Sequence, residues 1–262
     1  MRPPPDLEAR APEFPPKLEW LNVALLRMDR QLGRHAVLVE FWDFARVNSL
    51  RTLPYLKAWH ERYAELGLRV IGVHAPAYSF GRDSAAVAAA VERLEIPYAI
   101  ALDPHFEVWR LYGNRGWPGR YIFDSRGMLR DIHYGEGDYE GAELAIQELL
   151  REIEPDAELP PLLEPLRPED APGALLEPQT ADVSLPRERD RVELVRDWSE
   201  GEDYIEAADA GAGAKVEFRG GGAFAVLSGG VTPGVYETDG TVEAESAGLR
   251  LHGFQFTPAP PA

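Results

Sequence analysis

The sequence contains no cysteine among its 262 residues. This absence excludes disulfide bonds, cysteine-ligated zinc sites and every reaction in which a thiolate is the nucleophile. The sequence also lacks an apolar run of about 18 residues, the length that a membrane-spanning helix needs. Its beginning, MRPPPDLEAR, has no apolar stretch like that of a secretory signal peptide. We therefore expect a cytoplasmic protein without a membrane span.

Positive charge is also scarce. The sequence has 27 lysine and arginine residues against 44 aspartate and glutamate residues, which gives a formal net charge of −17. Because nucleic acids and anionic membranes repel such a chain, we expect neither as a partner. His105, His133 and His252 are scattered without the spacing of metal ligands, so we expect no metal and no cofactor.

The first part of the chain is predicted to alternate strands and helices. Up to about Lys17, six prolines predict an extended segment that is largely uncovered by other structure. Apolar runs and alternating patterns predict strands at 35–44, 68–76, 98–102, 120–123 and 129–134. Apolar residues at helical spacing predict helices at 49–66, 83–94, 106–112 and 141–153. This order of elements predicts an α/β sandwich with a mixed sheet.

The second part of the chain differs from the first in composition and in the pattern of its apolar residues. Eight prolines in 155–186 predict a semi-rigid, extended linker. Short strands expected at 192–195, 215–218, 223–227 and 249–256, with glycine-rich turns between them, predict a small all-β module that packs on the first domain or on a second copy of itself, as a homo-oligomer. The predicted organisation is an extended N-terminus at 1–17, an α/β domain at 18–153, a linker at 154–186, a β-sandwich-like module at 187–258 and a tail at 259–262.

The stretch FWDFARVNSLRTLPYL, from Phe41 to Leu56, carries the candidate site. An aromatic pair ends a predicted strand, and a short turn then leads into a helix. Arg46 and Ser49 lie at the beginning of this helix with two residues between them. We expect Asn48 or Ser49 to cap the helix. Pro54 lies inside the helix and is expected to kink it.

Several separate segments of the chain resemble the thioredoxin-like superfamily, and within it redoxin domains of the AhpC/TSA and TlpA/DipZ type. Besides the stretch above, these segments are VIGVHAP, ALDP, WPGRYIFD and GEGDY. The resemblance covers 18–153 and implies a thioredoxin-like sandwich, in which helices flank a mixed central sheet. The end of the chain, with the segment LHGFQF, is similar to the carbohydrate-binding-like β module that follows this domain in some DipZ proteins.

The resemblance also implies a degenerate active site. Arg46 and Ser49 stand where this family has the two cysteines of its Cys-x-x-Cys motif. Glu40 matches a buried acid that serves proton transfer to the thiol. Here it could be paired, protonated or exposed at the end of the strand, and we expect pairing rather than a catalytic use. Pro118 matches a cis-proline that faces the turn. The family implies thiol-disulfide oxidoreductase or redoxin peroxidase activity, but a chain without cysteine cannot carry out this reaction, and we assign no catalytic residue.

The former active-site face could still bind a partner. Trp42, Phe44, Trp117 and Pro118 could line a groove that holds a peptide by strand addition, or the two tryptophans could be packing residues. Arg46 is expected to turn outward or to recruit a small anion. We therefore expect a redox-inactive protein that binds a peptide, a protein partner or a small anion. The alternatives are an oxidoreductase or peroxiredoxin by homology, and a carbohydrate-binding adaptor whose β module binds a glycan.

Overall fold

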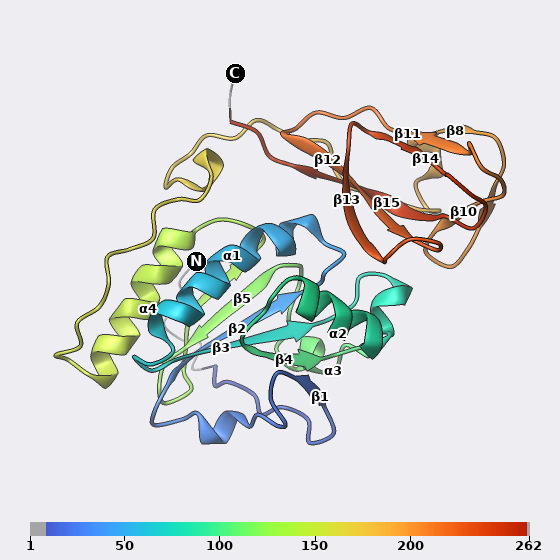
Figure 1. Cartoon of the computed structure of the whole chain (residues 1–262). Helices are drawn as coiled ribbons and strands as arrows, with labels where there is room; N and C mark the ends of the chain where they lie inside the picture. The colour runs from blue at the N-terminus through green and yellow to red at the C-terminus, as the bar shows by residue number, and fades with distance from the viewer. Residues whose placement is uncertain (1–8, 261–262) are drawn as a thin grey trace. The chain divides into compact units, whose positions relative to one another are not determined.

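The computed structural model describes residues 9–260, which form two compact units. Within this range, the first unit comprises 9–43, 48–75 and 87–172. The second unit comprises 44–47, 76–86 and 173–260. The second unit therefore includes two short stretches from the α/β region of the sequence, besides the whole C-terminal part (Figure 1).

The first unit contains a six-stranded mixed sheet with the strand order β1-β4-β3-β2-β5-β6 (Figure 1). Strands β2, β3 and β4 are parallel neighbours, whereas β1, β5 and β6 pair antiparallel. Every residue of β2 is buried, as expected for a central strand that is covered on both faces. The strands are β1 (Glu19–Leu21), β2 (Ala36–Trp42), β3 (Leu68–His74), β4 (Ala99–Leu102), β5 (Gly119–Phe123) and β6 (Leu129–Tyr134).

Two long helices, α1 and α4, lie side by side (Figure 1). The rings of Tyr55 on α1 and Tyr139 on α4 stack with centroids 3.7 Å apart. Pro54 lies within α1, where it has no amide hydrogen to donate to the preceding turn. The α-helices are α1 (Val47–Tyr63), α2 (Ser84–Arg93), α3 (Glu107–Leu111) and α4 (Tyr139–Ile153), and the 3₁₀ helices are η1 (Met28–Arg30), η2 (Ser79–Arg82), η3 (Pro168–Asp170) and η4 (Arg189–Arg191).

The N-terminal segment packs on the sheet through Phe14. This ring is buried and contacts Trp20 at a centroid distance of 5.1 Å and Tyr112 at 6.1 Å. It belongs to an apolar cluster with Val37 and Val39 of β2. The expectation that residues up to Lys17 are largely uncovered is therefore wrong around Phe14, because an aromatic side chain gains more by burial than a proline-rich backbone suggests. Residues 1–8 lie outside the described part of the chain.

The first half of the predicted linker is held on the first unit by hydrogen bonds. Gln147 Nε2 donates to the carbonyl of Pro160 at 2.7 Å. The amide of Leu163 donates to Glu143 Oε2 at 2.9 Å, and the amide of Leu166 donates to Tyr55 Oη at 2.8 Å. These bonds tie an extended segment to side chains of α1 and α4, which composition alone did not predict. The predicted domain limits remain a prediction.

The second unit is built from two antiparallel sheets (Figure 1). One has the order β13-β12-β15-β10-β9, with β7 also paired to β15, and the other has the order β14-β11-β8. The strands are β7 (Val183–Ser184), β8 (Glu193–Val195), β9 (Trp198–Glu200), β10 (Ile205–Ala207), β11 (Gly213–Lys215), β12 (Gly222–Ser228), β13 (Gly234–Thr238), β14 (Thr241–Glu243) and β15 (Arg250–Thr257).

The core of the second unit pairs large side chains with small ones. Phe254 and Phe256 of β15 lie opposite Ala225 and Ala223 of β12 in the register, and all four residues are buried. Trp198 is also part of this core. The predicted strand at 215–218 is wrong, because β11 ends at Lys215. The sequence also did not predict β1, β7, β9, β10, β13 and β14, which have five residues or fewer.

Candidate functional site

The carboxyl ends of β2 and β3 bring an acid and a base together in the first unit. Trp42 and His74 are register partners at these ends. His74 Nε2 lies 3.4 Å from Asp43 Oδ1, and both side chains are fully buried. Neither Asp43 nor His74 was among the predicted site residues. The signal that could have found them is that neighbouring parallel strands end at the same edge of a sheet.

Ser49 contacts the same end of β2. Its hydroxyl accepts a hydrogen bond from the backbone amide of Asp43 at 3.3 Å. Because α1 begins at Val47, Ser49 lies inside the first turn of the helix. The expectation that Asn48 or Ser49 precedes the helix as its cap is therefore wrong. Ser49 is buried and links the helix to the strand that precedes it.

In the second unit, the turn at 44–47 is bonded to strand β15. The amide of Val47 donates to Gln255 Oε1 at 2.7 Å, and Gln255 Nε2 donates to the carbonyl of Ala45 at 2.7 Å. Val47 is the first residue of α1, and amides at this position have no partner within their own helix. A buried carboxamide more than 200 residues away in the sequence therefore satisfies the amide at the start of α1.

Arg46 is paired within the second unit. Its guanidinium Nη1 lies 3.4 Å from Asp182 Oδ2, and its Cζ lies 5.5 Å from the centroid of the Tyr78 ring. Burial raises the pKa of the Asp182 carboxyl group, and the positive charge of Arg46 opposes this shift. The anion that Arg46 contacts is therefore a carboxylate of its own chain.

Apolar contacts surround this turn. Ala45, Tyr78 and Val226 form a buried cluster. The ring of Phe44 lies 5.7 Å from that of Phe80. The turn thus makes two kinds of contact in the second unit. Its backbone and Arg46 make polar contacts, and Phe44 and Ala45 make apolar contacts.

The residues of the predicted groove have different exposures. Trp42, Phe44 and Pro118 are buried, and Trp117 is half-buried. Trp117 Nε1 donates to the carbonyl of Ala75 at 2.8 Å, and its ring lies 4.5 Å from that of Trp109. The peptide bond between Trp117 and Pro118 is cis. These contacts favour the interpretation that the tryptophans are packing residues, and the groove remains a prediction.

Glu40 lies in the middle of β2, opposite Arg120 on β5. Its side chain is 1% exposed, and neither carboxylate oxygen has a hydrogen-bond partner among the described residues. Burial raises the pKa of Glu40 to about 7, although the charge of Arg120 opposes this shift. Arg120 instead donates to the carbonyl of Gly137 at 2.9 Å and lies over the ring of Trp59. Of the three states expected for Glu40, the burial and the raised pKa favour the protonated one over the paired and the exposed ones.

Comparison with known proteins agrees with this architecture. Residues 8–132 match the model of the AhpC/TSA family. The crystal structure of a thioredoxin-like superfamily protein matches 58% of this chain and 99% of its own, with a TM-score of 0.50 and 20% identity. The matched region has a thioredoxin-like fold. This confirms the predicted thioredoxin-like sandwich, and the predicted all-β region at the C-terminal end is also confirmed.

Two curated relatives are much longer than this chain. Protein DipZ of Mycobacterium tuberculosis (strain CDC 1551 / Oshkosh) is 37% identical over 172 residues, which cover 65% of this chain and 25% of the relative. Protein SUPPRESSOR OF QUENCHING 1, chloroplastic, of Arabidopsis thaliana is 32% identical over 137 residues, which cover 50% of this chain and 13% of the relative. The chain thus spans a quarter or less of the length of these relatives.

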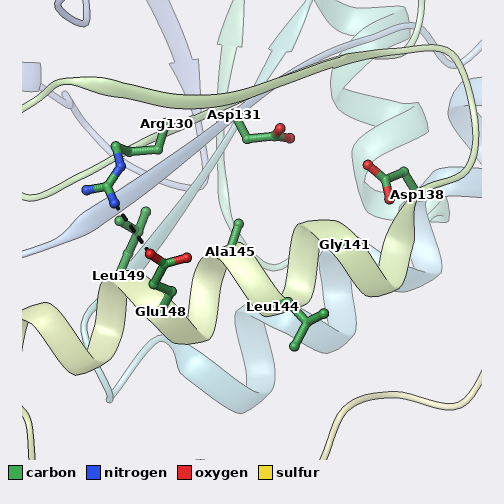
Figure 2. Close-up of a pocket in the computed structure, with 8 residues that line it drawn as sticks. All are labelled: Arg130, Asp131, Asp138, Gly141, Leu144, Ala145, Glu148 and Leu149. Atoms are coloured by element: carbon green, nitrogen blue, oxygen red, sulfur yellow. Dashed lines mark ion pairs between the residues drawn. The ribbon is translucent and has the colours of Figure 1, made fainter. Parts of the chain in front are cut away.

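A pocket of about 340 Å³ lies elsewhere on the first unit, between β6 and α4 (Figure 2). Arg130 points from β6 toward Glu148 of α4, at 3.7 Å. Arg130 also pairs with Glu152 at 2.9 Å and with Asp124 at 3.4 Å, so acidic side chains surround its charge. The lining residues are Arg130, Asp131, Asp138, Gly141, Leu144, Ala145, Glu148 and Leu149.

No group of three or more histidine, cysteine, aspartate or glutamate side chains among residues 9–260 is arranged to hold a metal ion. In the same range, no helix combines the length and the apolar character that crossing a membrane requires.

Proposed function

We propose that this chain is a redox-inactive redoxin in which the turn at 44–47 binds protein groups and does not exchange disulfides. The observation that carries the proposal is the pairing of Arg46 with Asp182 in a chain without cysteine. Disulfide exchange begins with attack by a thiolate. A guanidinium is not a nucleophile, and the hydroxyl of Ser49 already accepts the amide hydrogen of Asp43.

The turn presents three groups suited to binding an amide and a carboxylate. The carbonyl of Ala45 accepts a hydrogen bond, the amide of Val47 donates one, and Arg46 supplies a positive charge. Backbone groups of this kind bind extended peptides, and arginine binds carboxylates. Within the chain, Gln255 and Asp182 occupy these groups. A peptide or protein partner with acidic and amide side chains would compete with them for the same contacts.

Turnover assays test the first part of the proposal. We expect no reduction of insulin in the presence of dithiothreitol and no consumption of hydrogen peroxide above the uncatalysed rate, with an active thioredoxin and an active peroxiredoxin as references. Activity that exceeds that of the heat-denatured chain would contradict redox inactivity.

A peptide array tests the second part. Immobilised peptides that combine acidic residues with glutamine are probed with the wild-type chain, with Arg46→Ala and with a matched control, Arg196→Ala, at an exposed arginine of the second unit. We expect a signal that Arg46→Ala loses and Arg196→Ala keeps. A signal that is equal for all three proteins, or absent for all, would rule out recognition at this turn.

Glycan binding has less support. Trp198 is buried in the core of the second unit, and the ring of Tyr204 lies 4.6 Å from the guanidinium carbon of Arg250. Neither ring is therefore a free platform on which a sugar can stack. A carbohydrate-binding adaptor remains the weaker alternative.

A further inference from the structure

The second unit contains a serine, a histidine and an aspartate in hydrogen-bonding sequence, away from the turn at 44–47. Ser228 ends β12, His252 lies on the paired strand β15, and Asp203 lies between β9 and β10. Ser228 Oγ lies 2.8 Å from His252 Nε2. His252 Nδ1 lies 2.9 Å from the carbonyl oxygen of Asp203 and 3.4 Å from its carboxylate oxygen Oδ1.

This geometry fixes the tautomer of the neutral imidazole. A carbonyl oxygen can only accept a hydrogen bond, so His252 Nδ1 must carry the hydrogen that it shares with Asp203. His252 Nε2 then has a free lone pair, and the hydroxyl of Ser228 must donate to it. An imidazole that accepts the hydroxyl hydrogen of a serine, and that an aspartate holds from its other nitrogen, is the arrangement that activates serine as a nucleophile.

Asp203 is itself held in place. Its Oδ2 accepts a hydrogen bond from the amide of Ser79 at 2.5 Å, and its Oδ1 accepts one from the hydroxyl of Ser79 at 2.9 Å. His252 is enclosed by the rings of Tyr78, Phe80 and Tyr204, at centroid distances between 4.8 and 5.4 Å. The imidazole therefore cannot rotate away from Ser228 without moving three aromatic side chains.

We propose that Ser228, His252 and Asp203 form a nucleophilic site that hydrolyses small acyl esters. Ser228 is 5% exposed and His252 is 1% exposed. Because both side chains are buried, we expect only small esters to reach them. Gly229 and Gly230 follow Ser228 in a bend, and Gly230 is exposed, with no heavy atom within 4 Å of the position that a Cβ would take. We therefore expect the ester to enter from this side. The amide that follows a nucleophilic serine is a usual donor to the oxyanion, and in this chain that amide would be the one of Gly229.

The reaction balances with water as the second reactant. Ser228 Oγ forms a bond to the carbonyl carbon of the ester while its proton passes to His252 Nε2. The bond from that carbon to the alkoxy oxygen then breaks, and the alkoxide takes the proton from His252 and leaves as the alcohol. Water attacks the acyl-serine in the same manner, releases the carboxylic acid and restores the hydroxyl of Ser228.

The test uses the full chain and a small fluorophosphonate, followed by peptide mapping by mass spectrometry. We expect one adduct per chain, on Ser228, and hydrolysis of 4-nitrophenyl acetate above the rate of the heat-denatured chain. Ser228→Ala should lose both. Ser199→Ala is the matched control, because Ser199 is exposed on β9 but has no histidine beside it, and its loss should change neither.

The contribution of the imidazole is measured separately. His252→Gln should slow labelling by about 100-fold or more, which is the usual contribution of a general base, while circular dichroism checks that the variant is folded. If that variant does not fold, the adduct site on the wild-type chain decides. No adduct on Ser228 while a reference serine esterase is labelled, or equal labelling of Ser199, would overturn the proposal.

Discussion

The two units treat their buried polar groups differently. In the first unit, the carboxylate of Glu40, the indole nitrogen of Trp59 and the Nε of Arg120 have no hydrogen-bond partner among residues 9–260. In the second unit, both amide atoms of Gln255 and both ring nitrogens of His252 are bonded. A buried polar group without a partner costs about 1–3 kcal/mol, more if charged.

This difference separates two parts of the predicted degenerate site. The resemblance implies that a buried acid at the position of Glu40 serves a thiol at the turn, and this sequence has no cysteine to supply one. The backbone of the turn and Arg46, by contrast, are bonded to Gln255 and Asp182. Glu40 is thus a buried polar group without a hydrogen-bond partner among residues 9–260, whereas the backbone groups of the turn that contact Gln255 are bonded.

The largest change is expected from Arg46→Cys combined with Ser49→Cys. If the turn keeps its position at the start of α1, the free amides and the helix dipole should lower the pKa of the first thiol below about 8.5. Insulin reduction should then rise from the uncatalysed rate to a measurable turnover.

The matched control is Arg46→Cys alone, which can form a mixed disulfide but cannot resolve it. Titration of the thiols by absorbance at 240 nm provides the second measurement. A double variant whose thiols titrate like free cysteine would show that the contacts of Gln255 have reshaped the turn, and would weaken the equation of positions 46 and 49 with the lost cysteines.

The second largest effect concerns Glu40→Gln. The pKa of Glu40 is raised by burial from 4.5 to about 7, so the folded state holds its proton more tightly than the unfolded state does. The wild-type chain therefore loses stability as the pH rises from about 4.5 to 7. Because a shift of one pKa unit corresponds to about 1.36 kcal/mol, the wild-type chain loses about 3 kcal/mol of stability over this range. Glu40→Gln should remove most of this loss.

Urea denaturation at pH 5 and pH 8 measures this effect. The variant and the wild-type chain should differ little at pH 5, and the variant should be more stable at pH 8. Glu92→Gln, at an exposed position on α2, should change neither value. A difference that is the same at both pH values would show that Glu40 has a partner in solution.

The sequence predicted the elements of the first unit well for a physical reason. Buried central strands read as continuous apolar runs, and α4 repeats apolar residues at helical spacing, so both are local signals. Strands of two or three residues, such as β7 and β9, have too few residues to show a period. Phe14 could not be placed either, because its burial depends in part on Tyr112, which is distant from it in sequence.

The candidate site was predictable only in its outline. The spacing of Arg46, Ser49 and Pro54 pointed to the turn, since that signal lies within one stretch of sequence. The partners of the turn did not follow from it, because Asp182 and Gln255 lie more than 130 residues away. The state of Glu40 was left open between pairing, protonation and exposure, because the sequence does not show that Arg120 lies opposite Glu40 in the register and that its guanidinium donates to Gly137 instead.

A smaller effect is expected from Gln255→Ala. This change leaves the amide of Val47 and the carbonyl of Ala45 without their partner, which should lower the free energy of unfolding by about 1–3 kcal/mol. The amide of Val47 should also exchange its hydrogen faster. Gln179→Ala removes a single bond from an exposed glutamine of the same unit and serves as the control. If the amide of Val47 exchanges its hydrogen at an unchanged rate in this variant, the bond to Gln255 does not protect it. The proposed difference in the bonding of buried polar groups between the two units would then be contradicted.

The smallest effect is expected from Asp182→Asn. The ion pair between Arg46 and Asp182 has a distance of 3.4 Å, and the side chains are 22% and 37% exposed. Partly exposed pairs contribute about 0–1 kcal/mol, and salt screens them. The stability difference from the wild-type chain should therefore be below about 1 kcal/mol. It should shrink between about 0.05 and about 0.5 M sodium chloride, because added salt shortens the Debye length. A larger, salt-independent loss would mean that Asp182 holds the turn mainly through its bond to the amide of Phe256, and that the turn is fixed by backbone contacts and not by charge.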